Sequence, residues 1–186
     1  MRRETYHHGD LRRALLDAAA AVIAESGVAG LSMRDLARRA GVSHAAPAHH
    51  FGDKAGLLTA FAAEGFERLA EALESTGSFL DAGVAYVRFA VTHRAHFEVM
   101  FRPDLYHPEH PALVAARRRS GAALYAGVEE LPDAAADPGA VRQAGLAAWS
   151  LAHGFATLWL TGALPDTGDD PGEAARAVLT HLAHRP

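Results

Sequence analysis

Histidine has the largest number of possible chemical roles in this sequence. An imidazole can ligate a metal, transfer a proton, or donate and accept hydrogen bonds near neutral pH. The 186 residues include 12 histidines. Two pairs, His93 with His96 and His107 with His110, have a spacing at which helical side chains can share an ion. No carboxylate or third ligand is evidently grouped with either pair, so we expect no metal site.

Catalytic motifs are missing from the rest of the sequence. There are no cysteines, which excludes disulfides, thiolate metal sites and cysteine nucleophiles. We find no phosphate-binding glycine loop, no nucleophile elbow and no paired-acid motif. We therefore expect no enzymatic activity, no catalytic residue and no cofactor. The apolar run of a secretory signal does not follow Arg2 and Arg3, so we expect a cytoplasmic location.

The sequence predicts two short helices before a longer one. Ser32 is a good N-cap, and the helix that follows should occupy residues 33–40 and stop at Gly41. Ser43 is a second N-cap candidate, and the helix after it should close at Phe51. Two short helices that meet across about three residues cross steeply. This arrangement predicts a helix-turn-helix.

The first turn of the second short helix holds the residues expected to read DNA. In a helix-turn-helix, the N-terminal end of this helix enters the major groove. Serine and histidine can hydrogen-bond base edges, and alanine can contact thymine methyl groups. We expect His44 to be the main base reader. The expected base-contacting residues are Ser43, His44, Ala45 and Ala46.

Phosphate contacts are expected around the same helix. His49 and His50 lie near its end and Lys54 begins the next helix, where donor groups and helix N–H groups would meet phosphate oxygens. Ser32 and Arg34, at the start of the preceding helix, complete the expected DNA-binding set. Such contacts determine affinity and register rather than sequence preference.

The whole chain is expected to be all-α, because no stretch alternates as a half-buried strand would. Longer helices are expected at about 11–26, 54–74, 79–101, 112–131, 139–163 and 172–184, with proline-rich loops between the last four. We expect residues 1–54 to be a DNA-binding domain and residues 55–186 a helical domain for effector binding and dimerisation. The first part has eight Lys/Arg and six Asp/Glu and the second ten and sixteen, which places the basic excess with the DNA-binding part.

Residues 144–165 contain no Asp, Glu, Lys or Arg. An uncharged run of 22 residues is long enough to span a bilayer, so a membrane-attached helical protein is one alternative. Polar groups within the run would need partners in lipid, and acidic residues follow it where a basic flank would be expected. We favour a buried helix that forms a homodimer interface with the last helix, and expect no membrane partner. The expected interface residues are Leu146, Phe155, Leu158, Val178, Leu179 and Leu182.

Several short segments occur in a characteristic order and spacing. They are Leu15-Leu16-Asp17-Ala18-Ala19, Gly27, Ser32-Met33-Arg34-Asp35-Leu36-Ala37, Ala40-Gly41-Val42-Ser43, His50-Phe51 and Lys54-Ala55-Gly56-Leu57-Leu58. Over roughly residues 11–58 the chain resembles the tetracycline-repressor (TetR) family of bacterial regulators. The resemblance implies a homodimer that binds a palindromic double-stranded DNA operator, acts as a repressor and responds to a small-molecule effector.

Two residues depart from the family pattern. Pro47 stands where the family usually has leucine, and Ala48 stands where it usually has a phosphate-binding tyrosine. If Ser43 is the N-cap, Pro47 is the fourth helical residue and removes only the first intrahelical hydrogen bond. The helix is then kept, but one phosphate donor is lost.

The C-terminal half contains a second resemblance. Trp149, His153 and Gly154 form a Trp-x-x-x-His-Gly pattern, similar to the TetR C-terminal subtype named for those residues. Trp149 and His153 share a helix face, so they could orient a ligand or be a packed indole with a hydrogen-bonded histidine. An apolar effector pocket within this domain is expected to involve Tyr86, Phe89, His93, Phe97, Phe101, Tyr125, Trp149 and His153.

The sequence thus predicts a ligand-responsive transcriptional regulator, a homodimeric repressor that binds a palindromic operator and is released by a small apolar effector of unknown identity. Two alternatives stay open. One is a helical, dimeric ligand-binding protein without DNA binding. The other is the membrane-attached helical protein based on residues 144–165.

Overall fold

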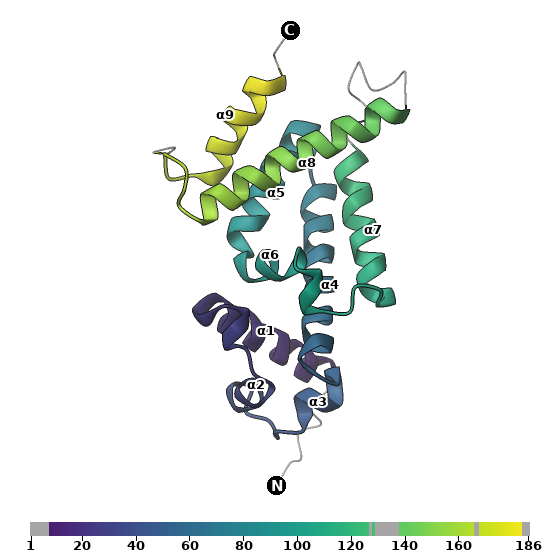
Figure 1. Ribbon diagram of the computed structural model, residues 1–186, viewed down its shortest axis with the longest axis vertical. Helices are drawn as coiled ribbons and strands as arrows, with labels where there is room; N and C mark the ends of the chain where they lie inside the picture. The colour runs from purple at the N-terminus through teal and green to yellow at the C-terminus, as the bar shows by residue number, and fades with distance from the viewer. Residues whose placement is uncertain (1–7, 127, 129–137, 166–167, 184–186) are drawn as a thin grey trace. The chain divides into compact units, whose positions relative to one another are not determined.

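The computed structural model describes residues 8–126, 128, 138–165 and 168–183, and these residues form helices joined by turns (Figure 1). Within them there is no strand, so the all-α prediction is confirmed. The elements are α1 (His8–Ser26), η1 (Val28–Gly30), α2 (Met33–Arg39), α3 (Ala46–Phe51), α4 (Lys54–Glu74), α5 (Phe79–Thr92), α6 (Arg94–Met100), η2 (Pro103–Leu105), α7 (Pro111–Ala126), α8 (Pro138–Leu160) and α9 (Pro171–Ala183). Here η1 and η2 are single 3-10 turns.

The chain groups into two compact units. Unit 1 contains residues 1–64 and 95–114, and unit 2 contains residues 65–94 and 115–186. Helix α4 therefore contributes its first half to unit 1 and its second half to unit 2. The domain boundary expected after residue 54 lies at the start of α4.

Unit 1 is built around the apolar faces of α1 and the first half of α4. The three- and four-residue spacing of apolar residues in α1 puts Leu15 and Ile23 on one buried stripe. Leu36 from α2 and Phe61 from α4 are fully buried in the same unit. This core holds the short helices α2 and α3, which are too short to be stable alone.

Unit 2 is organised by α5, which packs against both α8 and α9. Tyr86 and Val87 of α5 are almost fully buried. Helix α8 approaches α7 closely at Gly145, where an added Cβ would lie 2.1 Å from Cε1 of Tyr125. Glycine is required there because any side chain would meet the tyrosine ring.

Ion pairs connect the outer sides of the unit 2 helices. Arg119 of α7 binds Glu67 and Glu74 of α4, with closest N–O distances of 2.6 Å to each. The Arg119 guanidinium holds the pKa of Glu74 below its usual range. These groups are more than two-fifths exposed, so they orient the helices but stabilise the fold little.

The prediction of one helix over residues 79–101 is wrong, because the structure has two helices there. Helix α5 ends at Thr92, His93 leaves helical geometry at φ −112° and ψ 42°, and α6 follows. No glycine or proline marks the break. It occurs where the chain passes from unit 2 to unit 1, so each helix buries its apolar side in a different core.

Three prolines that we expected to lie in loops are instead the first residues of helices. Pro111, Pro138 and Pro171 are the first residues of α7, α8 and α9. The first helical N–H has no intrahelical partner, so proline loses nothing at that position. Helix α7 is described as far as Ala126, and residues 127 and 129–131 of the expected helix lie outside the described residues.

The uncharged run at residues 144–165 falls mostly within α8. Across the part of the chain that the structure describes, no helix combines the length and apolar character needed to cross a membrane.

Candidate nucleic-acid interface

The turn between α2 and α3 is set by glycine. Gly41 has φ +66°, and nothing lies within 4 Å of the position its Cβ would take. Its N–H donates to the Arg38 carbonyl at 3.2 Å, and the N–H of Val42 donates to the Ala37 carbonyl at 3.0 Å. These two bonds form a Schellman motif, which ends a helix at a residue of left-handed conformation. Helix α2 therefore stops where the sequence predicted, and the chain turns into α3.

The start of α3 differs from the prediction. Ser43 does not cap the helix: its carbonyl accepts the N–H of Ala46 at 3.0 Å in a turn, and α3 begins at Ala46 with Ala45 as its N-cap. Pro47 is the reason, because it has no N–H to donate to Ser43 and close an α-helical turn there. Pro47 thus lies in the first turn of α3, where it is tolerated, and is not the fourth helical residue.

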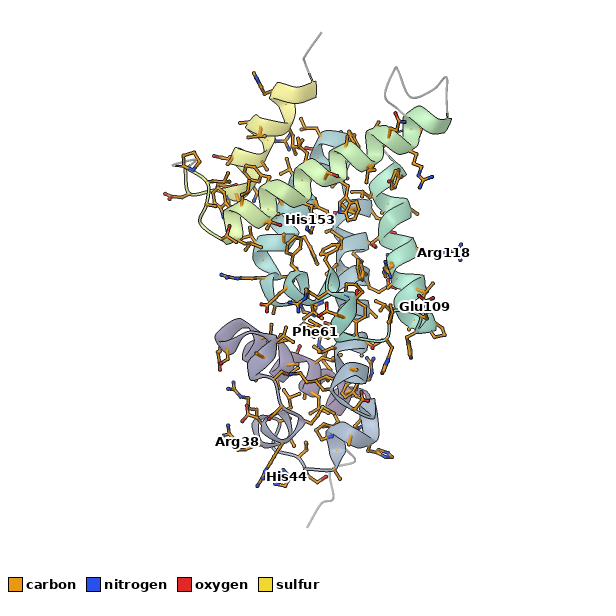
Figure 2. The ribbon with its side chains drawn as sticks, viewed as in Figure 1. Arg38, His44, Phe61, Glu109, Arg118 and His153 are labelled. Carbon is orange, nitrogen blue, oxygen red and sulfur yellow. The ribbon has the colours of Figure 1, made fainter. Side chains whose placement is uncertain are left out.

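The expected base readers lie mainly in that turn. Ser43, His44 and Ala45 are exposed, and Ala46 is half-buried at the first position of α3. Figure 2 shows His44 and Arg38 projecting outward from the α2–α3 part of unit 1. We call residues 43–50, which contain the base readers predicted from the sequence, the DNA-reading segment.

The expected phosphate-contacting residues of α3 differ in exposure. His49 is exposed, and His50 is half-buried with its ring 5.7 Å from that of His49 and 6.3 Å from that of Phe51. Arg12 of α1 lies over the Phe51 ring at 5.6 Å, a cation–π contact that ties α1 to the end of α3. The segment is thus fixed at its C-terminal end and exposed at its N-terminal end.

Two other expected DNA contacts come from α2. The Oγ of Ser32 accepts the N–H of Asp35 at 3.1 Å, which confirms the predicted N-cap. Arg34 is exposed, and no ion pair of its side chain occurs among the described residues. Ser32 therefore positions α2, whereas the side chain of Arg34 faces solvent.

The remaining arginines of α2 are held by carboxylates. Arg39 binds Glu25 of α1 at 2.9 Å and Asp35 at 2.9 Å, and Arg38 also binds Asp35. The Arg38 and Arg39 guanidinium groups hold the pKa of Asp35 below its usual range, and Arg39 does the same for Glu25. The 14-residue separation of Glu25 and Arg39 gives no helical-spacing signal, so sequence reasoning missed this link.

Lys54 has an internal partner. Its ammonium group donates to the carbonyl of Val28 in η1 at 2.9 Å, while the N–H of Val28 lies 3.4 Å from a carboxylate oxygen of Glu98. Lys54, Glu98 and Arg102 are among the residues lining a groove of about 350 Å³ here. The start of α4 is also capped, since Asp53 accepts the N–H of Gly56 at 2.8 Å.

A second polar group lies within unit 2, and we call Tyr86, Trp149 and His153 the tyrosine cluster. The indole N–H of Trp149 donates to the Tyr86 oxygen at 3.1 Å, and that oxygen lies 2.8 Å from Nδ1 of His153. Because the tyrosine oxygen already accepts from Trp149, its own proton is placed to be donated to Nδ1. Burial raises the pKa of the Tyr86 phenol and lowers the pKa of the His153 imidazole.

The other expected effector residues are not all in one unit. Phe89 and His93 are in unit 2 with ring centroids 5.1 Å apart, and Tyr125 packs on Gly145. Phe97 and Phe101 belong to unit 1, where their rings contact each other at 5.3 Å. The apolar stripe read from the sequence is thus divided between two cores.

The residues expected at a dimer interface are partly exposed. Leu146, Leu158 and Val178 are 50%, 46% and 39% exposed, unusual values for large apolar side chains, and Leu151 at 36% joins them although sequence reasoning did not include it. Phe155 is buried and stacks on Trp159 within unit 2. Leu179 is half-buried against Gly83, and the side chain of Leu182 lies outside the described residues.

Among the residues that the structure describes, no group of three or more His, Cys, Asp or Glu side chains that could hold a metal ion occurs. His96 is buried, stacks on Phe61 at 4.0 Å and lies 3.8 Å from a carboxylate oxygen of Glu64. His107 lies 3.9 Å from a carboxylate oxygen of Asp53.

Comparison with known proteins identifies the family. The model described as "Bacterial regulatory proteins, tetR family" matches residues 15–61, and the model described as "Tetracyclin repressor-like, C-terminal domain" matches residues 79–182, which is more than half of the chain. The chain belongs to the TetR family. This TetR-family chain is also similar over nearly its full length to a solved structure from Rhodococcus sp. RHA1, a protein of unknown function. The identity is 37%, the coverage 97% of both chains and the TM-score 0.78.

Two curated regulators match parts of this TetR-family chain. The HTH-type transcriptional regulator BetI of Rhizobium meliloti (strain 1021) is 37% identical over 102 residues, which are 53% of this chain and 45% of that protein. The HTH-type transcriptional repressor AcnR of Corynebacterium glutamicum is 39% identical over 66 residues, which are 36% of this chain and 35% of that protein. Each match spans less than half of the relative's length.

Proposed function

We propose that this protein is a ligand-responsive, DNA-binding transcriptional repressor. The observation that carries the proposal is the exposed DNA-reading segment. It follows a Schellman turn on α2 and presents Ser43, His44 and Ala45 at the N-terminal side of α3. In a helix-turn-helix this end of the second helix enters the major groove. Membership of a family of bacterial regulatory proteins supports the same function.

The proposed protein–DNA contacts are of two kinds. His44 and Ser43 contact base edges, and Ala45 and Ala46 contact thymine methyl groups. Arg34, His49 and His50 contact phosphates, with Ser32 and Lys54 at the adjoining helix starts. Because Lys54 donates to the Val28 carbonyl, its role is to couple the start of α4 to η1 as well as to face DNA. Arg34 is therefore the more direct probe of phosphate binding.

A homodimer is proposed to place two such segments on a palindromic operator. The support is the exposed apolar side chains of α8 and α9, which include Leu146, Leu158 and Val178. Exposed large apolar side chains on two neighbouring helices are typical of a surface that a partner covers. A twofold dimer would repeat each DNA-reading segment, and half-sites about one helical turn apart would follow from that symmetry.

The effector is proposed to bind in unit 2 near the tyrosine cluster, which includes Trp149 and His153 of the Trp-x-x-x-His-Gly pattern. Buried polar groups among apolar side chains are what an apolar effector pocket uses to orient its ligand. Release from DNA requires that the effector binds the conformation unable to match both half-sites more tightly than the conformation that can. The proposed effector is a small and mostly apolar molecule.

Selection from a random-sequence duplex library tests the DNA-binding function. We expect the purified protein to enrich a palindromic site and to bind it more weakly as salt concentration rises. The variant Arg34→Ala should weaken binding to all duplexes, and the matched exposed arginine variant Arg118→Ala in α7 should not. A protein that retains no duplex even at low salt would instead be the helical ligand-binding protein without DNA binding.

A further inference from the structure

The α2–α3 part of unit 1 is poor in permanent positive charge. Residues 40–53 contain no Lys or Arg and one acidic residue, Asp53. In α2, Arg38 and Arg39 are already paired with carboxylates. Arg34 is the only arginine of α2 outside an ion pair among the described residues. Neutralised phosphates supply much of the affinity of DNA-binding proteins, and α2 and α3 offer little unpaired permanent charge for this.

Histidine is the side chain that can supply the missing charge. His44 lies in the exposed turn before α3, and His49 is exposed four residues after Ala45 on α3. Neither imidazole has a carboxylate within ion-pair distance among the described residues. His49 has one ring contact, to His50 at 5.7 Å. An imidazole can be neutral or cationic within the physiological pH range, unlike a lysine or arginine side chain.

The charged and titratable groups on the elements around these histidines are few. They are Arg34, Asp35, Arg38 and Arg39 from α2, Arg12, Glu25 and the ion pair of Arg13 with Asp17 from α1, His50 from α3, Asp53 and Lys54 before and at the start of α4, and His107 beside Asp53. Asp35 and Glu25 are neutralised by Arg38 and Arg39. The local balance therefore depends on whether the histidines are protonated.

We propose that His44, beside the base edges, and His49, beside the phosphates, supply a titratable share of the positive charge that attracts the DNA, so that DNA binding takes up protons and weakens as the pH rises. This inference rests on the proposed DNA-binding function. It adds that part of the affinity depends on histidine charge, in a stretch of residues 40–53 that contains no Lys or Arg.

The sign of the effect follows from electrostatics. A phosphate oxygen beside an imidazole favours the imidazolium form, so the DNA-bound protein holds its protons more tightly than the unbound protein. Linkage then makes binding tighter at low pH, and the gain is lost as the pH rises past the range in which the bound imidazolium deprotonates. Each protonated histidine that neutralises a phosphate also steepens the dependence of log affinity on log salt by about 0.9.

The test measures binding of a fluorescent duplex of mixed sequence and about 30 base pairs, which exceeds the span of two half-sites. Anisotropy titrations at constant ionic strength, at about pH 6 and about pH 8, bracket the imidazole range. We expect wild-type affinity to fall about tenfold or more between the two conditions, and the salt dependence to become shallower.

Paired substitutions separate charge from shape. The double variant His44→Gln with His49→Gln keeps hydrogen-bonding side chains without a titratable charge, so it should bind weakly with the same affinity at both pH values. The double variant His44→Arg with His49→Arg has permanent charge, so it should bind tightly at both. The control His110→Gln changes an exposed histidine before α7 and should keep the wild-type pH dependence. Far-UV circular dichroism verifies that each variant is folded.

Two results would overturn the inference while leaving the proposed function intact. One is wild-type binding of equal strength at both pH values, and the other is an unchanged pH dependence in the double glutamine variant. A third result concerns the DNA-binding function itself. If no variant, including the double arginine variant, binds duplex at any pH and low salt, that function is overturned and this inference with it.

Discussion

The DNA-reading segment of unit 1 and the tyrosine cluster of unit 2 hold their polar side chains in opposite ways. In the segment, Ser43, His44 and His49 are exposed, and the backbone that carries them is shaped by bonds between residues three to five apart. In the cluster, the hydrogen bonds to Tyr86 cross 63 and 67 residues of sequence, and the phenol is 1% exposed. Exposed groups can change with little effect on folding, whereas buried groups depend on one another.

The largest expected effect comes from removing the centre of the cluster. Tyr86→Ala should reduce the free energy of unfolding by about 3–5 kcal/mol, because it leaves a cavity and removes the partner of two polar side chains. Tyr86→Phe should lose about 1–3 kcal/mol, because the ring stays and only the hydroxyl is lost. Urea unfolding followed by circular dichroism measures both. A Phe variant as stable as the wild type would show that the hydrogen bonds contribute nothing to folding.

A smaller loss is expected at the turn of unit 1. Gly41→Ala should reduce the free energy of unfolding by about 1–2 kcal/mol, because alanine is strained at φ +66°. The control is Gly121→Ala in α7, where an added Cβ meets nothing within 4 Å and the conformation is helical. That change should stabilise the protein by up to about 1 kcal/mol. Equal effects of the two substitutions in urea unfolding would contradict the Schellman turn.

The next effect in size is a pH dependence of the free energy of unfolding, which should distinguish the tyrosine cluster from the DNA-reading segment. Burial lowers the pKa of His153, so the folded protein binds this proton less readily than the unfolded chain does. The contribution of neutral His153 to the free energy of unfolding is complete above the pKa of an unfolded imidazole, about 6.5. It is lost as the pH falls toward the lower pKa of the folded protein. Unfolding at pH values across this range should therefore show lower stability on the acid side.

The variant His153→Gln is the control for that window. The difference in unfolding free energy between the wild type and this variant should shrink as the pH falls below the unfolded value. Carboxylates such as Asp35, whose pKa is lowered by Arg38 and Arg39, lose their contribution only at more acidic pH. A difference that stays constant with pH would show that His153 titrates alike in both states.

The smallest effect on folding is expected in the DNA-reading segment. His44→Ala should change the free energy of unfolding by less than about 0.5 kcal/mol, because the side chain is exposed and packs against little. The same change should alter base preference at one position of a selected site by about tenfold or more. Parallel unfolding and duplex-competition measurements test both parts. A large loss of stability with unchanged base preference would contradict the view that exposed residues of the DNA-reading segment can change with little effect on folding.

Local sequence signals predicted the helix-turn-helix well. The cap at Ser32 and the stops at Gly41 and Gly52 appear as expected, because each depends on a bond or a backbone angle within a few residues. Ser43 was the exception. Its side chain suits an N-cap, but Pro47 four residues later cannot donate the N–H that would close the helical turn on its carbonyl. Pro47 is therefore the residue in the sequence that indicates the later start of α3.

Effects of packing could not be read in the same way. Nothing around His93 marks the end of α5, and the aromatic stripe that includes Phe89 and Phe97 looks continuous in sequence. The chain divides there because the two helices bury their apolar sides in different cores. Periodicity shows that a face is apolar, but it does not show which core that face will join.

The sequence by itself determined the all-α class, the cap at Ser32, the stop of α2 at Gly41 and the family, because these depend on residues close together along the chain. Only the tertiary structure decided that Lys54 would bind the Val28 carbonyl, that Arg39 would bind Glu25, and that Tyr86 would join Trp149 to His153. These pairs come from separate helices and loops. Their meeting depends on how apolar surfaces are buried, and sequence spacing does not encode that.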